Sequence, residues 1–107
     1  MTVPKDVRLL TQRVVVKMAK DLEWDDNGHR HEAFGLFVPQ ERLIYLRKGM
    51  APDYERQTFL HENLHLIIET ANILTDDEEA LVHRLSPILL SWLRENPDAV
   101  EYLQEMT

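Results

Sequence analysis

Near the start of the chain, hydrophobic residues recur at intervals of four. They are Leu10, Val14, Met18 and Leu22. Residues four apart share one face of a helix, and Pro4 stands where a first helical turn can begin. The pattern predicts an amphipathic helix over residues 4–22, although the β-branched run at 14–16 fits a helix less well. The polar stretch at residues 25–28 then predicts a turn.

From residue 34 to residue 47, hydrophobic residues recur at intervals of two instead of four. The stretches FGLFV and RLIYLR flank Pro39-Gln40-Glu41 and distribute their apolar side chains over two sides. Short alternating runs around such a break are typical of paired strands. Residues 34–47 therefore predict a β-hairpin, which Gly49 and Pro52 end.

Helical spacing returns from Asp53 to about Asn72. A stripe of apolar residues lies along one face of this segment and predicts a helix that packs against the core. Its members are Leu60, Leu64, Ile67, Ile68 and Ala71.

A second helical segment follows a short break. Thr75, with Glu78 three residues later, matches the capping-box pattern that begins helices. Pro87 lies inside this helix and can kink it. Asn96-Pro97 ends it, and a short last helix is expected over residues 98–105. The expected apolar face consists of Val82, Leu85, Leu89 and Trp92.

These elements predict a small α+β domain with an N-terminal helix, a β-hairpin, a long helix, an antiparallel helix and a short C-terminal helix. A chain of 107 residues suffices for one compact domain and not for two, so residues 1–107 are expected to form a single unit. Trp24 and Trp92 are expected to fill the core.

The composition narrows the classes of function. Hydrophobic residues make up 44% of the chain, which is enough for a core. The formal net charge is −7 and no basic block is present, which argues against a nucleic-acid or anionic membrane surface. The chain has no cysteine, which excludes disulfides and thiolate metal sites. No signal peptide or membrane span is visible, so a cytoplasmic location is expected.

The long predicted helix contains His61-Glu62-Asn63-Leu64-His65. Side chains four apart lie one above the other on a helix, so both imidazoles can reach one ion. Neutral imidazole is a good zinc ligand. Glu62 projects beside the ion, where it can take a proton from a water molecule on the zinc and pass it to a leaving amine. The motif predicts one zinc ion on His61 and His65 with Glu62 as catalytic base, against the alternative of a helix that carries two histidines by chance.

A catalytic zinc ion needs a third protein ligand and one open position. Glu78 and Glu79 open the next helix. At about 100° per residue, Glu78 falls in line with the apolar face and is the better geometric candidate, although it can instead close the capping box. Glu79 lies at the margin of that face and is the alternative. Glu69 shares the histidines' face but stands two turns beyond His61, too far to reach the same ion.

Other residues have both a functional and a structural interpretation. His29 and His31 could bind a metal or be solvated turn residues, and His83 is expected at the surface. Tyr54 stands two turns before His61, where it could line a cleft, stabilise an oxyanion or simply pack half-buried.

The stretches RQTFLHENLH and LTDDEEALVHRLSPILLSWLRENP resemble the small ImmA/IrrE-type metallopeptidases, which are common in phages and mobile elements. The resemblance covers residues 35–102 and implies a minimal zincin-like fold. It implies His61 and His65 as zinc ligands, Glu62 as general base, and Glu78 or Glu79 as third ligand. The acidic pair follows His65 at a shorter spacing than in better-known members of that family.

Besides a plain structural or assembly component, two functions are compatible with the sequence. The first is a zinc-dependent endopeptidase that acts on a protein or peptide, with a transcription regulator as the substrate that the resemblance implies. The second is a non-catalytic binding module on a peptidase-like fold, which holds a host or phage regulator without cutting it. Addition of an extended peptide to the hairpin edge beside the zinc suits both.

Overall fold

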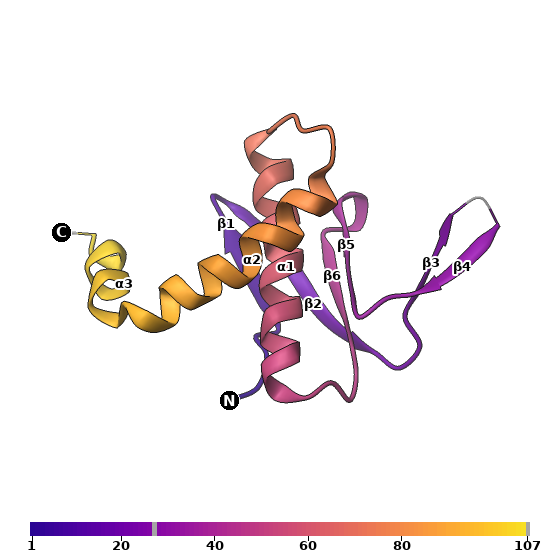
Figure 1. Cartoon of the computed structure of the whole chain (residues 1–107), viewed down its shortest axis with the longest axis horizontal. Coiled ribbons are helices and arrows are strands. Elements are labelled where there is room, and N and C mark those ends of the chain that lie inside the picture. The colour runs from indigo at the N-terminus through magenta and orange to yellow at the C-terminus, as the bar shows by residue number, and fades with distance from the viewer. Residues whose placement is uncertain (27, 107) are drawn as a thin grey trace.

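The computed structural model describes residues 1–26 and 28–106, and for residues 25, 26 and 29–31 it describes the backbone alone. A mixed sheet lies behind one long helix, and a second helix crosses that helix obliquely (Figure 1). The predicted α+β class is confirmed. The elements are β1 (Asp6–Leu9), β2 (Gln12–Ala19), β3 (Glu23–Asp26), β4 (His29–Glu32), β5 (Gly35–Val38), β6 (Leu43–Arg47), α1 (Pro52–Ala71), α2 (Glu78–Glu95) and α3 (Pro97–Gln104).

Four strands form the main sheet in the order β1-β2-β6-β5. β2 and β6 are parallel, whereas β1 pairs with β2 and β5 with β6 in the antiparallel sense. β3 and β4 form a separate two-stranded ribbon that projects from the body, on the side opposite to α3 (Figure 1). Among the described residues, β5 is therefore one edge of the main sheet.

The helix predicted over residues 4–22 is wrong, because β1 and β2 form an antiparallel hairpin there. An interval of four is also a multiple of two, so residues spaced in this way share one face of a strand as well. Val14 and Val16 are 0% and 8% exposed on that face, and β-branched side chains pack well on a sheet. Leu10 turns the chain with a φ of 58°, so no glycine or asparagine marked the hairpin.

The later elements follow the predictions more closely. β5 and β6 form the expected hairpin, with Phe37 opposite Ile44. The helix predicted from Asp53 is α1, and the short last helix is α3. The N-cap of α2 is Asp77, whose carboxylate accepts a hydrogen bond from the Ala80 N–H at 3.0 Å. The predicted capping box of Thr75 and Glu78 is therefore wrong.

The core fixes α1 on two sides. Leu66 of α1 joins the inward-facing side chains of β2 and β6 in one buried cluster. Leu64 and Ile68 of α1 pack against Val82 of α2 in another. Because both clusters lie along the middle of α1, the stretch from His61 to His65 is held between the sheet and the start of α2.

Neither tryptophan fills the core, contrary to the sequence prediction. Trp24 is 44% exposed and Trp92 is 41% exposed. Trp24 lies on the projecting ribbon, and the buried cluster between α2 and α1 consists of Val82 with Leu64 and Ile68, without Trp92. Within the described residues, no helix combines the length and the apolar character needed to cross a membrane.

Candidate metal centre

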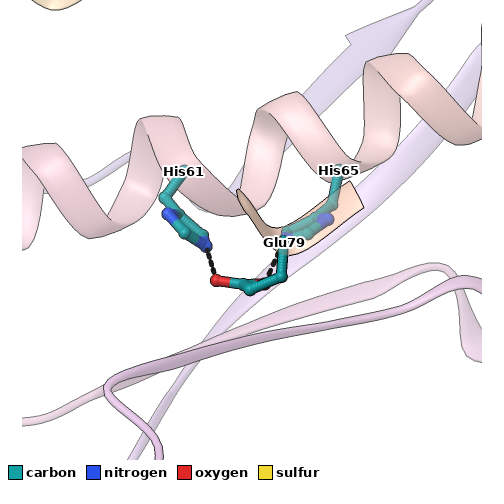
Figure 2. A group of neighbouring side chains, drawn as sticks. All are labelled: His61, His65 and Glu79. Carbon is teal, nitrogen blue, oxygen red and sulfur yellow. Dashed lines mark hydrogen bonds and ion pairs between the residues drawn. The ribbon is translucent and has the colours of Figure 1, made fainter. Parts of the chain in front are cut away.

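The two histidines of the HENLH stretch lie one turn apart on α1 and point toward the first turn of α2 (Figure 2). Their ring centroids are 5.1 Å apart. The side chains of His61 and His65 are 19% and 13% exposed, because they border the buried stripe of α1. The helical spacing therefore brings both rings to one place, as the sequence predicted.

Glu79 joins the two rings. Its Oε1 lies 2.8 Å from His61 Nε2 and its Oε2 lies 2.9 Å from His65 Nε2, so one carboxylate spans both nitrogens (Figure 2). Among the described residues, the ligand atoms of His61, His65 and Glu79 all lie within 4.8 Å of one another. In this geometry Glu79, the alternative candidate, faces both rings, whereas Glu78, the first candidate, contacts His65 alone.

The donor set fits a zinc ion. Two imidazoles and one carboxylate are a known ligand set of catalytic zinc sites, which keep a fourth position open. Zinc–ligand bonds of about 2.1 Å place neighbouring ligand atoms about 3.4 Å apart around a tetrahedral ion. The observed nitrogen–oxygen distances of 2.8 and 2.9 Å are shorter. A small outward shift of Glu79, whose side chain is 66% exposed, would make the room.

Glu78 occupies a different place beside His65. Its Oε2 lies 2.7 Å from His65 Nδ1, the ring nitrogen that faces away from Glu79. A carboxylate at Nδ1 accepts a hydrogen bond from the Nδ1–H, which keeps the proton on Nδ1 and leaves the Nε2 lone pair for a metal. Such partners fix both the tautomer and the ring orientation. Glu78 is therefore placed to orient His65.

Burial keeps His61 in the form that binds metal. Its pKa is lowered because removal from solvent disfavours the imidazolium ion, while the negative charge of Glu79 acts in the opposite direction. A neutral imidazole has a free lone pair and is the ligand form.

Glu62 lies beside the candidate metal position without joining it. Its Oε2 is 4.0 Å from His61 Nε2, and its side chain is 9% exposed. Burial raises the pKa of Glu62 to about 7, and the charge of Glu79 adds to this, while His65 and a hydrogen bond from the Phe37 N–H oppose it. A carboxyl group with a pKa near neutrality can both accept and donate a proton at physiological pH.

Gly35 allows the close approach of β5 to Glu62. A Cβ atom at this position would lie 2.7 Å from Thr58 Cγ2, 2.9 Å from Glu62 Cγ and 3.0 Å from Glu62 Oε2. Atoms do not approach so closely, so only glycine lets the strand run this near to α1. This contact could not be predicted from the sequence, since nothing local to Gly35 marks it.

A cleft of about 1050 Å³ opens over the cluster, between α1, β5 and the start of α2. The three candidate ligands, Glu62 and Tyr54 are among the residues that line it, and for Tyr54 this agrees with one of its sequence interpretations. The cleft therefore gives a ligand of peptide size access to the cluster.

The remaining candidates fall outside the ligand group. An oxygen of the Glu69 carboxylate lies 3.5 Å from Arg42 Nη1, in an ion pair. This agrees with the low rank of Glu69 as a third metal ligand in the sequence-based prediction. His83 is exposed as predicted, yet it also lines the cleft. The side chains of His29 and His31 lie outside the described residues.

No family model, curated protein or solved structure matches this chain. The case for a function therefore rests on the residues of the site.

Proposed function

We propose that this protein is a zinc-dependent peptidase similar to the ImmA/IrrE-type enzymes, with His61, His65 and Glu79 as zinc ligands and Glu62 as general base. The observation that supports this proposal most is that the three candidate ligands converge on one position while Glu62 lies beside that position without joining it. Three ligand atoms converge within 4.8 Å, while Glu62 Oε2 stays 4.0 Å from the nearer imidazole nitrogen. A structural zinc site would more commonly be closed by a fourth protein ligand.

A zinc ion held by these three ligands would supply positive charge that polarises a carbonyl group and makes a water molecule easier to deprotonate. Glu62 receives the proton of the attacking water and later donates it to the leaving amine. The Phe37 N–H holds the Glu62 carboxylate in place during both transfers. Glu78 keeps His65 in the ligand tautomer through Nδ1.

The edge strand β5 favours an extended peptide as substrate. The Phe34 carbonyl accepts from the Arg47 N–H of the β6 side, whereas the Phe37 N–H is directed to Glu62. Backbone groups of a strand alternate between its two edges, so Gly35, like Phe37, presents its N–H and C=O to the open edge. A peptide paired with Gly35 would pass beside Glu62.

A protein regulator, and specifically a transcription regulator, is the substrate that the resemblance favours. A cytoplasmic location belongs to the same proposal, and the cysteine-free composition is compatible with it.

The test compares purified wild type with Glu62→Gln and Glu95→Gln. Zinc content is measured by elemental mass spectrometry, and cleavage is measured on a library of unstructured peptides. We expect one zinc per chain in all three proteins and a loss of cleavage of about 10²–10⁴-fold in Glu62→Gln alone. Glu95 lies on α2 and accepts from Ser91, so it is a matched carboxylate outside the cleft.

Two results would contradict the proposal. Wild type that takes up no zinc would remove the metal site. The non-catalytic binding module would be favoured if the protein takes up zinc, cleaves no peptide of the library, and binds these peptides equally well as wild type and as Glu62→Gln.

A further inference from the structure

Three aromatic side chains form part of the cleft lining, and two of them are in contact. Trp24, Phe34 and Tyr54 are 44%, 46% and 46% exposed, and all three line the cleft. They come from the projecting ribbon, from the residue before β5 and from the first turn of α1. Large apolar surfaces that stay half-exposed in a cleft are typical of a ligand-binding wall.

Phe34 and Tyr54, two of the three rings of this wall, are held in place by contacts within the fold. The rings of Phe34 and Tyr54 meet edge to face, with centroids 5.3 Å apart and planes at 85°. The guanidinium carbon of Arg47 lies 5.3 Å from the Phe34 centroid. Arg47 is itself fixed, because it donates to the carbonyl oxygens of Ala33 at 2.9 Å and Leu22 at 2.8 Å. A ligand therefore loses little affinity to ordering of this wall.

The position of the wall relates it to the proposed reaction. Phe34 directly precedes Gly35, whose backbone approaches Glu62. Tyr54 is eight residues before Glu62 on α1, a rise of about 12 Å along the helix axis. An extended chain advances about 3.3 Å per residue, so this span corresponds to roughly three or four substrate residues.

The charge beside the wall decides which side chain suits it. Aromatic faces attract cations as well as apolar groups. Here Arg47 already lies over Phe34 and is paired with Glu32 at 3.6 Å, so a second cation would have to compete with Arg47 for this face. A large uncharged apolar side chain suits these surroundings best.

We propose that Trp24, Phe34 and Tyr54 form a specificity subsite for a large apolar or aromatic side chain of a peptide substrate, a few residues from the bond that is cut. This proposal rests on the proposed function, because it names the class of substrate that the peptidase prefers.

The test uses zinc-loaded Glu62→Gln, so that binding is measured without cleavage, and three blocked pentapeptides with Phe, Ala or Lys between flanking alanines. Affinities are measured by NMR titration. Burial of a Phe side chain predicts binding roughly tenfold or more tighter for the Phe peptide than for the Ala peptide. The added Tyr54→Ala substitution should reduce this preference roughly three- to tenfold, since one aromatic partner is lost.

Tyr102→Ala is the matched control, because Tyr102 is 76% exposed on α3 and does not line the cleft. It should leave the preference unchanged. Tyr54 is an exposed helix residue, so its replacement by alanine should not unfold the chain, and circular dichroism verifies this.

Equal affinities for the Phe and Ala peptides, tighter binding of the Lys peptide, or the same loss in Tyr102→Ala would each overturn the subsite. Failure of the two proposals can be told apart. Cleavage of library peptides by wild type without an apolar preference would contradict the subsite alone. A Phe preference in a protein without zinc or cleavage would support the subsite and contradict the peptidase.

Discussion

The two halves of the candidate zinc site differ in how firmly the fold holds them. His61, Glu62 and His65 lie in the middle of α1, packed between the sheet and α2, and their side chains are 19%, 9% and 13% exposed. Glu78 and Glu79 occupy the first turn of α2, directly after an exposed loop, and their side chains are 40% and 66% exposed.

This difference implies an order of assembly. The α1 half is formed by the packing of α1 between the sheet and α2. The α2 half contributes Glu79, which pairs with both imidazoles but is far more exposed, so zinc binding would shift Glu79 more readily than the two histidines. We therefore expect changes in the α1 half to abolish the site and changes in the α2 half to weaken it.

The largest expected effect comes from His65→Ala, which removes one of the two imidazole ligands in the α1 half. Zinc affinity should fall by more than about 100-fold, beyond the range typical for loss of an outer hydrogen-bond partner. Competition with a zinc-binding dye measures this. His83→Ala is the control, since His83 is outside the ligand group, and equal zinc affinity in both variants would contradict the assignment.

The two glutamates of α2 separate direct ligation from orientation. We expect Glu78→Gln to weaken zinc binding by about 10–100-fold, because it loses the charged acceptor at His65 Nδ1. Glu79→Gln should weaken it further, since a neutral amide oxygen replaces the anionic carboxylate ligand. Calorimetric titration with zinc measures both, with Glu95→Gln as control. A stronger effect in Glu78→Gln would reverse the two roles.

Gly35→Ala probes the contact that positions Glu62. The added methyl group must displace Thr58 or Glu62, which should lower the free energy of unfolding by about 1–3 kcal/mol. Cleavage should fall while zinc affinity stays the same, because the ligands lie elsewhere. Urea unfolding and peptide hydrolysis measure the two effects.

Gly49→Ala serves as the comparison for that variant. Gly49 has a φ of 87° and nothing within 4 Å of its missing Cβ, so alanine there strains the backbone without touching Glu62. If both variants lose stability and activity to the same extent, the special role of Gly35 is refuted.

The smallest effect concerns an ion pair that ties the end of α2 to the start of α1. The hydrogen bond from Arg94 lowers the pKa of Asp53 below its ordinary value of 3.8. The pair therefore stabilises the fold above that value, and its contribution is lost as the pH falls through the lowered pKa. The small difference in urea midpoint between wild type and Arg94→Ala should be present at pH 7 and shrink in acid. If the urea midpoints of wild type and Arg94→Ala still differ by the same amount at low pH, the stabilising role of the Asp53–Arg94 ion pair is contradicted.

The parts of the site that depend on local spacing could be predicted from the sequence. His61 and His65 share a helix face because they are four apart, and this holds wherever the helix is packed. The order of Glu78 and Glu79 could not be predicted, since it depends on where Asp77 begins α2 and on how that helix crosses α1.

The same distinction explains the fold. In residues 34–105 the spacing of hydrophobic residues fits either a strand or a helix in each segment, but not both. The hairpin and the helices of this region could therefore be predicted. The interval of four between Val14 and Met18 suits a helix and a strand equally, and the hairpin turn at Leu10 has no usual turn residue. The close approach at Gly35 and the aromatic wall arise from tertiary packing, which no local pattern encodes.

The proposed zinc site is tested most directly by an anomalous diffraction map from crystals of the zinc-loaded protein, recorded at the zinc absorption edge. The account predicts one peak between the rings, about 2.0–2.2 Å from His61 Nε2, His65 Nε2 and an oxygen of Glu79. Glu62 should remain outside bonding distance. A map with no peak there, or with zinc bound at other residues while the two rings point apart, would contradict it.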